Sequence, residues 1–153
     1  FENQILEGVG FGLERALYAT YISNLPLERF SIKLKKFNDH RGDFLEAFKT
    51  KSSGQVSFFT INIGFTRGGH YHHTKSEKFL VVKGKVKFKF INILNNQEEI
   101  IYTDDSKPVM IHTIPGWAHD ITNVGDSEVI VMLWANEIFD KDNPDTFQYE
   151  MNK

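Results

Sequence analysis

Apolar residues recur along this chain with two different periods. From about Leu13 to Asn24 they return every three to four residues, which is the period of a helix that buries one face. Pro26 follows, and because the residue before a proline avoids helical geometry, we predict that the helix ends there. The first 12 residues contain three glycines and no clear period. We expect them to form a tail or a connecting segment.

Beyond Pro26 the pattern changes to short stretches rich in Val, Ile, Phe and Thr, separated by Gly, Asn, Asp or Pro. This pattern is typical of an all-β sandwich or barrel. In the stretch 85–90, lysines alternate with Val86, Phe88 and Phe90, so the apolar set is expected to face the core. The run 129–134 is apolar throughout, which predicts a strand covered on both faces. The predicted strands are 30–37, 43–50, 55–65, 77–82, 85–93, 98–103, 109–114, 120–123 and 127–134.

Length and composition narrow the class of protein. The chain has 153 residues, no cysteine and a formal net charge of −2. A single domain of this size folds without disulfides, and the absence of cysteine excludes thiolate metal sites and cysteine nucleophiles. The near-neutral charge predicts no nucleic-acid partner. No apolar run reaches the roughly 20 residues of a membrane span, and no signal-peptide pattern is present, so we expect no membrane insertion and a cytoplasmic protein.

Three of the six histidines lie within four residues, at His70, His72 and His73. On a strand His70 and His72 share a face, while Tyr71 and His73 point away from it. Glu77 follows after a gap long enough for a turn, and His119 comes on a later hairpin. Three imidazoles and a carboxylate suit zinc, iron, manganese, nickel or copper. We therefore predict a metal site formed by His70, His72, Glu77 and His119.

The spacing of these residues resembles the two cupin motifs. Gly64, His70, His72, Glu77 and Gly84 stand at the fixed positions of the first motif. Pro115-Gly116, His119 and Asn123 resemble the second, although its leading glycine is absent and its proline is displaced. The resemblance implies an all-β cupin fold, a double-stranded β-helix or jelly roll, with these three histidines and the glutamate as metal ligands. The helix predicted from the apolar period would precede it as an N-terminal helix.

Two finer resemblances narrow the chemistry. Phe37, Asp39, Arg41-Gly42, Phe44 and Glu46 resemble the opening motif of deoxysugar 3,5-epimerases, metal-free enzymes in which the histidine corresponding to His70 is a base. The segments 17–21 with 25–26, 70–84, and 134–137 with 144–146 resemble the C-terminal part of bifunctional capsular-polysaccharide enzymes of the CapF/WbjC type. No reductase motif is present, and the chain begins with Phe1. We therefore expect residues 1–26 to connect to a missing N-terminal reductase domain, and residues 27–153 to form the cupin domain.

The second resemblance implies a zinc-binding epimerase domain that acts on a UDP-linked 4-keto-6-deoxy-N-acetylhexosamine at C3, on the route to UDP-N-acetyl-L-fucosamine. It also implies a homodimer, and NADPH chemistry confined to the missing domain. Epimerisation needs an acid and a base, and the residues near the cluster leave several choices open. The acid–base candidates are Tyr71, Lys75, His73, Lys78 and His112. The candidates for binding the diphosphate are Arg41, Arg67 and Lys83.

Other classes of function compete with this interpretation. The domain can be a non-catalytic module that binds sugar nucleotide or forms the dimer. A metal-dependent dioxygenase would require a redox-active metal. A sugar-sensing regulatory cupin would need a DNA-binding partner, and the sequence contains no helix-turn-helix or basic patch.

Overall fold

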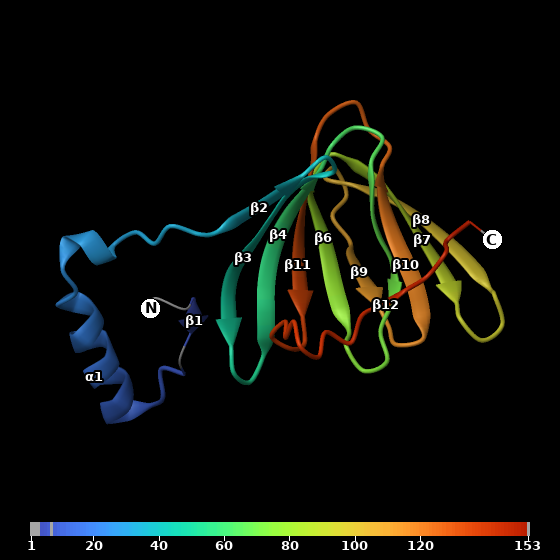
Figure 1. Cartoon of the computed structure of the whole chain (residues 1–153). Coiled ribbons are helices and arrows are strands. Elements are labelled where there is room, and N and C mark those ends of the chain that lie inside the picture. Colours follow the sequence, from blue (N-terminus) through green and yellow to red (C-terminus); the bar gives the residue numbers. More distant parts are fainter. Residues whose placement is uncertain (1–3, 7, 153) are drawn as a thin grey trace.

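The computed structural model describes residues 4–6 and 8–152. The N-terminal part contains the helix α1 (Gly12–Ser23) and the 3-10 helix η1 (Leu27–Arg29), which agrees with the helix predicted from the apolar period. The rest of the described chain is built from strands (Figure 1). The strands are β1 (Ile5–Leu6), β2 (Lys36–Asp39), β3 (Gly42–Thr50), β4 (Gly54–Ile61), β5 (Thr66–Tyr71), β6 (Glu77–Lys83), β7 (Lys85–Asn92), β8 (Glu98–Asp104), β9 (Met110–Thr113), β10 (Trp117–Asn123), β11 (Val129–Ala135) and β12 (Phe147–Gln148).

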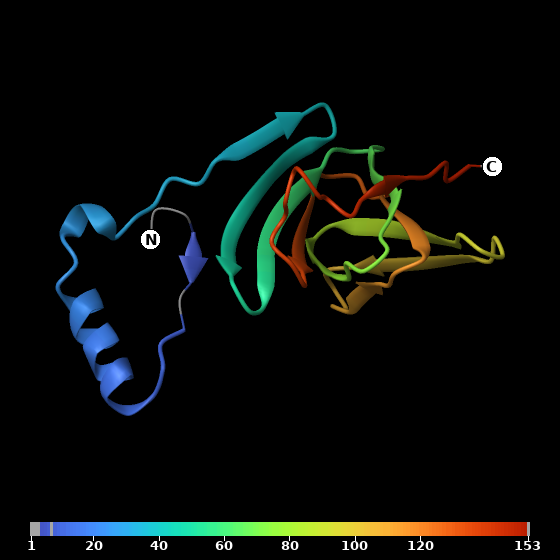
Figure 2. The same ribbon diagram turned by 60° about the horizontal axis from the view of Figure 1, so that its bottom comes forward.

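The strands form two facing sheets. One sheet has the order β1-β3-β4-β11-β6-β9, with β2 added beside β3, and the other has the order β12-β5-β10-β7-β8. All pairs are antiparallel except β1 with β3. From β4 onward the chain passes repeatedly from one sheet to the other, which is the course of a jelly roll (Figures 1 and 2). The predicted all-β double-stranded β-helix is confirmed.

The core lies between the sheets and forms the floor of the site described below. Val86, Phe88 and Phe90 are buried, as the alternation with lysines predicts. Phe79 packs edge-on against Phe88, with ring centroids 5.7 Å apart, and its ring centroid lies 6.0 Å from that of His119. Apolar packing therefore reaches up to the imidazole of a predicted metal ligand.

The bounds of several strands differ from those predicted. The prediction 30–37 is wrong for most of its length, because β2 begins only at Lys36, where pairing with β3 starts. The predicted strands do not include Thr66–Tyr71, because this segment contains two glycines and no apolar alternation. Strand β11 is fully covered on only one face: Val129 and Val131 are buried, whereas the alternating side chains are partly exposed.

The helix α1 lies to one side of the barrel in both views (Figures 1 and 2). It buries no residue, and Leu13, Leu17 and Tyr21 are exposed. Within the described residues no helix is long and apolar enough to cross a membrane. The predicted division into residues 1–26 and 27–153 stays a prediction.

Candidate metal centre

Two neighbouring strands and one tight loop bring the predicted ligands together. His70 on β5 lies directly opposite His119 on β10, and opposite residues of antiparallel strands share a face. His72 follows β5 immediately, and Glu77 is the first residue of β6 after a short loop. The close approach of β5 to β10 depends on Gly68, which has a φ of +100° and faces the backbone of His119 so closely that a Cβ would lie 2.7 Å from its carbonyl oxygen.

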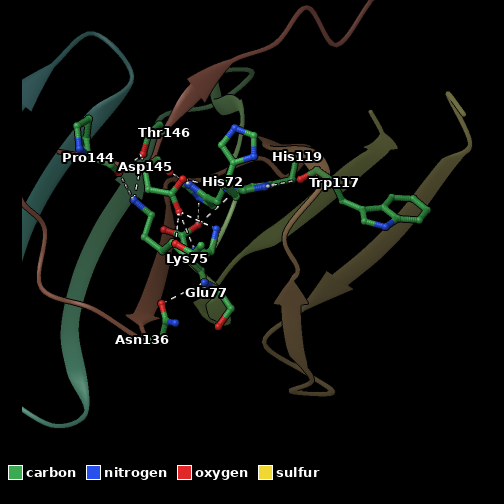
Figure 3. Close-up of polar contacts among 12 residues, drawn as sticks. His72, Lys75, Glu77, Trp117, His119, Asn136, Pro144, Asp145 and Thr146 are labelled. Carbon is green, nitrogen blue, oxygen red and sulfur yellow. Dashed lines mark hydrogen bonds and ion pairs between the residues drawn. The ribbon is translucent and has the colours of Figure 1, made fainter. Parts of the chain in front are cut away.

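The ligand atoms of the four side chains converge on one point. Figure 3 shows His72, Glu77 and His119 of this group. One ligand atom from each of them lies within 4.8 Å of the others. The Oε2 atom of Glu77 is 3.2 Å from Nε2 of His72 and 3.3 Å from Nε2 of His119. His72, Glu77 and His119 are buried, and His70 is half-buried. The predicted ligand cluster is therefore assembled as a group.

The distances and the hydrogen-bonding roles fit a metal ion. The Nδ1 atom of His72 lies 2.6 Å from the backbone carbonyl oxygen of Asp145, and because a carbonyl only accepts, Nδ1 carries the proton. In the neutral form of the ring, Nε2 then carries a lone pair directed at the carboxylate of Glu77, an arrangement that a cation between the two atoms would stabilise. Four ligands at zinc distances in a tetrahedron lie about 3.4 Å apart, close to the distances from Oε2 of Glu77 to the Nε2 atoms of His72 and His119.

Burial and neighbouring charges set the protonation of the cluster. Burial, followed by the proximity of His119, lowers the pKa of His70 from 6.5 to about 4, so its imidazole is neutral near pH 7. Burial would raise the pKa of Glu77, but the adjacent imidazoles of His119 and His72 outweigh it and hold the pKa well below its usual range. Neutral imidazole and ionised carboxylate are the forms that bind metals.

Two adjoining cavities open onto the cluster. The larger has a volume of about 460 Å³ and a mostly apolar lining, and the smaller has a volume of about 290 Å³. Both are bordered by His70 and Glu77. The other residues that line the larger cavity are Phe37, Phe44, Glu46, Gln55, Ser57, His72, Lys75, Leu133, Ala135, Glu137, Phe139 and Thr146.

Three further predicted residues reach these cavities. Arg41 and Arg67 line the smaller one, where Arg41 makes a double contact with Asp39. Arg67 is mostly buried and donates a hydrogen bond from Nε to the carbonyl oxygen of Thr60. Lys75 is buried at the edge of the larger cavity, and its Nζ donates to the carbonyl oxygen of Pro144 and to Oγ1 of Thr146 (Figure 3).

The remaining predicted residues lie elsewhere. Tyr71 stacks on Phe147, and His73 packs edge-on against the same ring. The Nζ of Lys78 lies over the ring of Trp134, and exposed His112 stands opposite Lys78 on β9. Lys83 is exposed at the end of β6. The structure does not bring the side chains of these five residues to the lining of either cavity.

Sequence reasoning missed two polar residues, Gln55 and Ser57, that line the larger cavity together with Glu77. Gln55 and Glu77 belong to one row across the sheet, with Ala135 between them. Gln55 is buried and donates to Oγ of Ser57, 3.0 Å away, and these two residues occupy inward positions of β4. The signal was in the sequence, because two inward-facing positions of this strand hold polar residues where buried apolar residues were expected.

A jelly roll with three histidines and a glutamate converging inside the barrel defines a cupin domain. The fold is shared with solved cupins of low sequence identity. The cupin domain of the Drosophila melanogaster protein CENP-C matches with a TM-score of 0.56 and 16% identity, over 67% of this chain and 70% of that one.

The chain belongs to the polysaccharide biosynthesis C-terminal domain family, whose model matches residues 37–147. A Pseudomonas aeruginosa protein named UDP-2-acetamido-2,6-beta-L-arabino-hexul-4-ose reductase is 57% identical over 139 residues, which cover 91% of this chain and 37% of that protein. The crystal structure of the capsular polysaccharide assembling protein CapF from Staphylococcus aureus matches with a TM-score of 0.91 and 39% identity, over 96% of this chain and 43% of that one. The chain thus spans about two-fifths of the length of each of these relatives.

Proposed function

We propose that this domain catalyses C3 epimerisation of a UDP-linked 4-keto-6-deoxy-N-acetylhexosamine on the route to UDP-N-acetyl-L-fucosamine for capsular polysaccharide. In this proposal a reductase domain outside the chain reduces C4 with NADPH. The observation that carries the proposal is the cluster of His70, His72, Glu77 and His119 at the junction of two cavities. The name of the Pseudomonas relative supports the substrate class, because it describes a UDP-linked 4-keto sugar with a 2-acetamido group.

The two cavities suit different parts of such a substrate. The mostly apolar lining of the larger one, with Phe37, Phe44 and Phe139, offers contact to the methyl groups of a 6-deoxy sugar and of an acetamido group. Arg41 and Arg67 border the smaller cavity, and a guanidinium fork matches the oxygens of a diphosphate. Both cavities touch the cluster, so the ring carbons of the bound sugar would lie beside it.

Epimerisation next to a ketone removes a proton from C3 and returns it to the opposite face. The barrier arises from the weak acidity of that carbon and from the negative charge that develops on the C4 oxygen. His70, His72, Glu77 and His119 would hold a zinc ion, which supplies Lewis-acid stabilisation of that charge when bound. His72, Glu77 and His119 are buried, and burial strengthens the electrostatic contacts that they make.

Lys75 is the acid–base residue of this proposal. Of the predicted candidates, it is the one whose side chain lines a cavity that the cluster also lines. Two N–H groups of its ammonium donate to Pro144 and Thr146, so the third can give a proton to the substrate, and the neutral amine left behind can accept one. Tyr71, His73 and Lys78 face aromatic rings away from the cavities and would have to move to act.

Deuterium incorporation at C3 of the keto sugar in D₂O tests the proposal directly. The zinc-loaded protein should incorporate deuterium, and His119→Ala should lose both bound metal and incorporation. Unchanged incorporation in a variant shown to be metal-free would overturn the Lewis-acid role and leave the metal structural. Tight binding of the sugar nucleotide without any incorporation by the loaded wild type would overturn the epimerase and favour a binding module. We expect the domain to form a homodimer, and the molar mass measured by light scattering tests this.

A further inference from the structure

The segment Pro144–Thr146 lies across the loop that joins β5 to β6, and Asp145 is its central residue (Figure 3). Its Oδ1 accepts the backbone N–H of His73 at 2.9 Å. Its Oδ2 accepts the backbone N–H groups of Thr74 and Lys75, at 2.9 and 2.8 Å, and the hydroxyl of Thr74. Three consecutive N–H groups around a carboxylate form a nest that fixes the loop as well as the acid.

The backbone of Asp145 is held in an uncommon conformation. Its φ is +39°, a region that few residues other than glycine adopt and in which Asp and Asn are enriched. Buried Lys75 fastens both flanks of the residue, through the carbonyl oxygen of Pro144 and the hydroxyl of Thr146. Strained residues persist where the surroundings over-determine them, and they gather at functional sites.

This arrangement fixes the position of one atom, the backbone carbonyl oxygen of Asp145. The backbone carbonyl oxygen of Asp145 lies 2.6 Å from Nδ1 of His72. That contact keeps the proton on Nδ1, turns the ring and directs Nε2 toward Glu77. The carbonyl of Asp145 thus has the role that a carboxylate or carbonyl commonly has beside a metal-binding histidine, and the side chain of Asp145 acts through it.

We propose that Asp145 is a positioning residue for the metal site: its carboxylate anchors the loop 73–75, so that its own carbonyl sets the tautomer and orientation of His72. This inference rests on the metal site of the proposed function and is independent of the epimerase activity. Partners of this kind typically change metal affinity 10- to 100-fold when they are removed.

The test measures the affinity for Zn²⁺ by competition with a chelator. Asp145→Asn and Asp145→Gly both tolerate a positive φ, but the first leaves N–H donors facing an amide and the second removes the anchor entirely. Both should bind Zn²⁺ about 10- to 100-fold more weakly than wild type. Asp142→Asn, at an exposed aspartate three residues before Asp145, is the matched control and should bind like wild type.

Affinities of both Asp145 variants within twofold of wild type would overturn the inference alone, whereas a wild type that binds no Zn²⁺ would overturn the proposed metal site as well. A second measurement needs no variant. In ¹⁵N-edited NMR spectra of the zinc-loaded wild type, His72 should show a proton on Nδ1 that exchanges slowly with water. Zinc bound through Nδ1 of His72 would overturn the inference whether or not the variants fold.

Discussion

Nε2 of His119 lies 3.3 Å from Oε2 of Glu77 and, among the described residues, has no hydrogen-bond partner. A buried nitrogen without a partner normally costs about 1–3 kcal/mol, and a bound metal ion removes that cost. Substituting Glu77 by Gln keeps the shape of the side chain but removes the charged ligand. We expect Glu77→Gln to bind Zn²⁺ at least about 100-fold more weakly, as measured by chelator competition. Glu99→Gln, on the exposed side of β8, should leave the affinity unchanged.

Metal binding should also stabilise the fold. A ligand present at about 1,000 times its Kd raises the free energy of unfolding by about 4 kcal/mol when it binds only the folded state. Zn²⁺ should therefore raise the Tm of wild type in a concentration-dependent way, and chelator should reverse the rise. The same titration on His119→Ala should give no shift in Tm, and an equal shift would place the stabilising ion elsewhere on the molecule.

The stability of the metal-free protein should depend on pH through His70. Its pKa is about 4 in the folded state, against an ordinary value of 6.5, because burial disfavours the charged ring. Below pH 6.5 His70 binds a proton in the unfolded chain but not in the folded chain. The free energy of unfolding therefore falls as the pH falls, until His70 is also protonated in the folded state near pH 4. The loss amounts to about 3 kcal/mol.

Urea unfolding in the presence of chelator, at pH 7, 5.5 and 4.5, measures this contribution. His70→Asn cannot take up the proton, so its free energy of unfolding should fall less steeply over this range than that of wild type. An identical fall in both proteins would show that His70 does not titrate with a lowered pKa.

The four ligands could be predicted from the sequence because their geometry is local. His70, His72 and Glu77 lie on the end of one strand, a short loop and the start of the next, so spacing alone places them together. His119 was predicted from the second cupin motif, because this sequence keeps the motif's spacing between glycine and histidine. Most strands were predicted for a similar reason, since their apolar alternation follows the face that each buries.

The features that could not be predicted from the sequence depend on contacts between distant parts of the chain. Asp145 is separated by 72 residues from the N–H group of His73 that it accepts, and no local pattern encodes that pairing. The apolar stretch at 30–35 predicts a strand, yet it lies off the sheet because pairing with β3 begins only at Lys36. Which cavity a lysine faces likewise follows from the folded arrangement, which is why Lys75 and Lys78 are equivalent candidates in the sequence.

The core beneath the site offers a test of the packing. Phe88 is fully buried and contacts the ring of Phe79, which in turn packs against His119. Phe88→Ala should lower the free energy of unfolding by about 3–5 kcal/mol, measured by urea unfolding of the metal-free protein. Leu94→Ala, at an 89% exposed position, should change it by less than about 0.5 kcal/mol. A loss of less than about 1 kcal/mol for Phe88→Ala would contradict the core position.

The contact between Gly68 and His119 links the fold to the metal site. At Gly68 the φ is +100°, and an added Cβ would lie 2.7 Å from the carbonyl oxygen of His119, so β5 and β10 would have to separate. Gly64 also has a positive φ, +75°, but a Cβ there would meet no atom within 4 Å. Both substitutions to Ala should cost the strain of a positive φ, about 1 kcal/mol. Only Gly68→Ala should in addition weaken Zn²⁺ binding, because it displaces His119 from His70. Equal Zn²⁺ affinities in the two variants, measured by chelator competition, would show that the ligand cluster does not depend on this close approach.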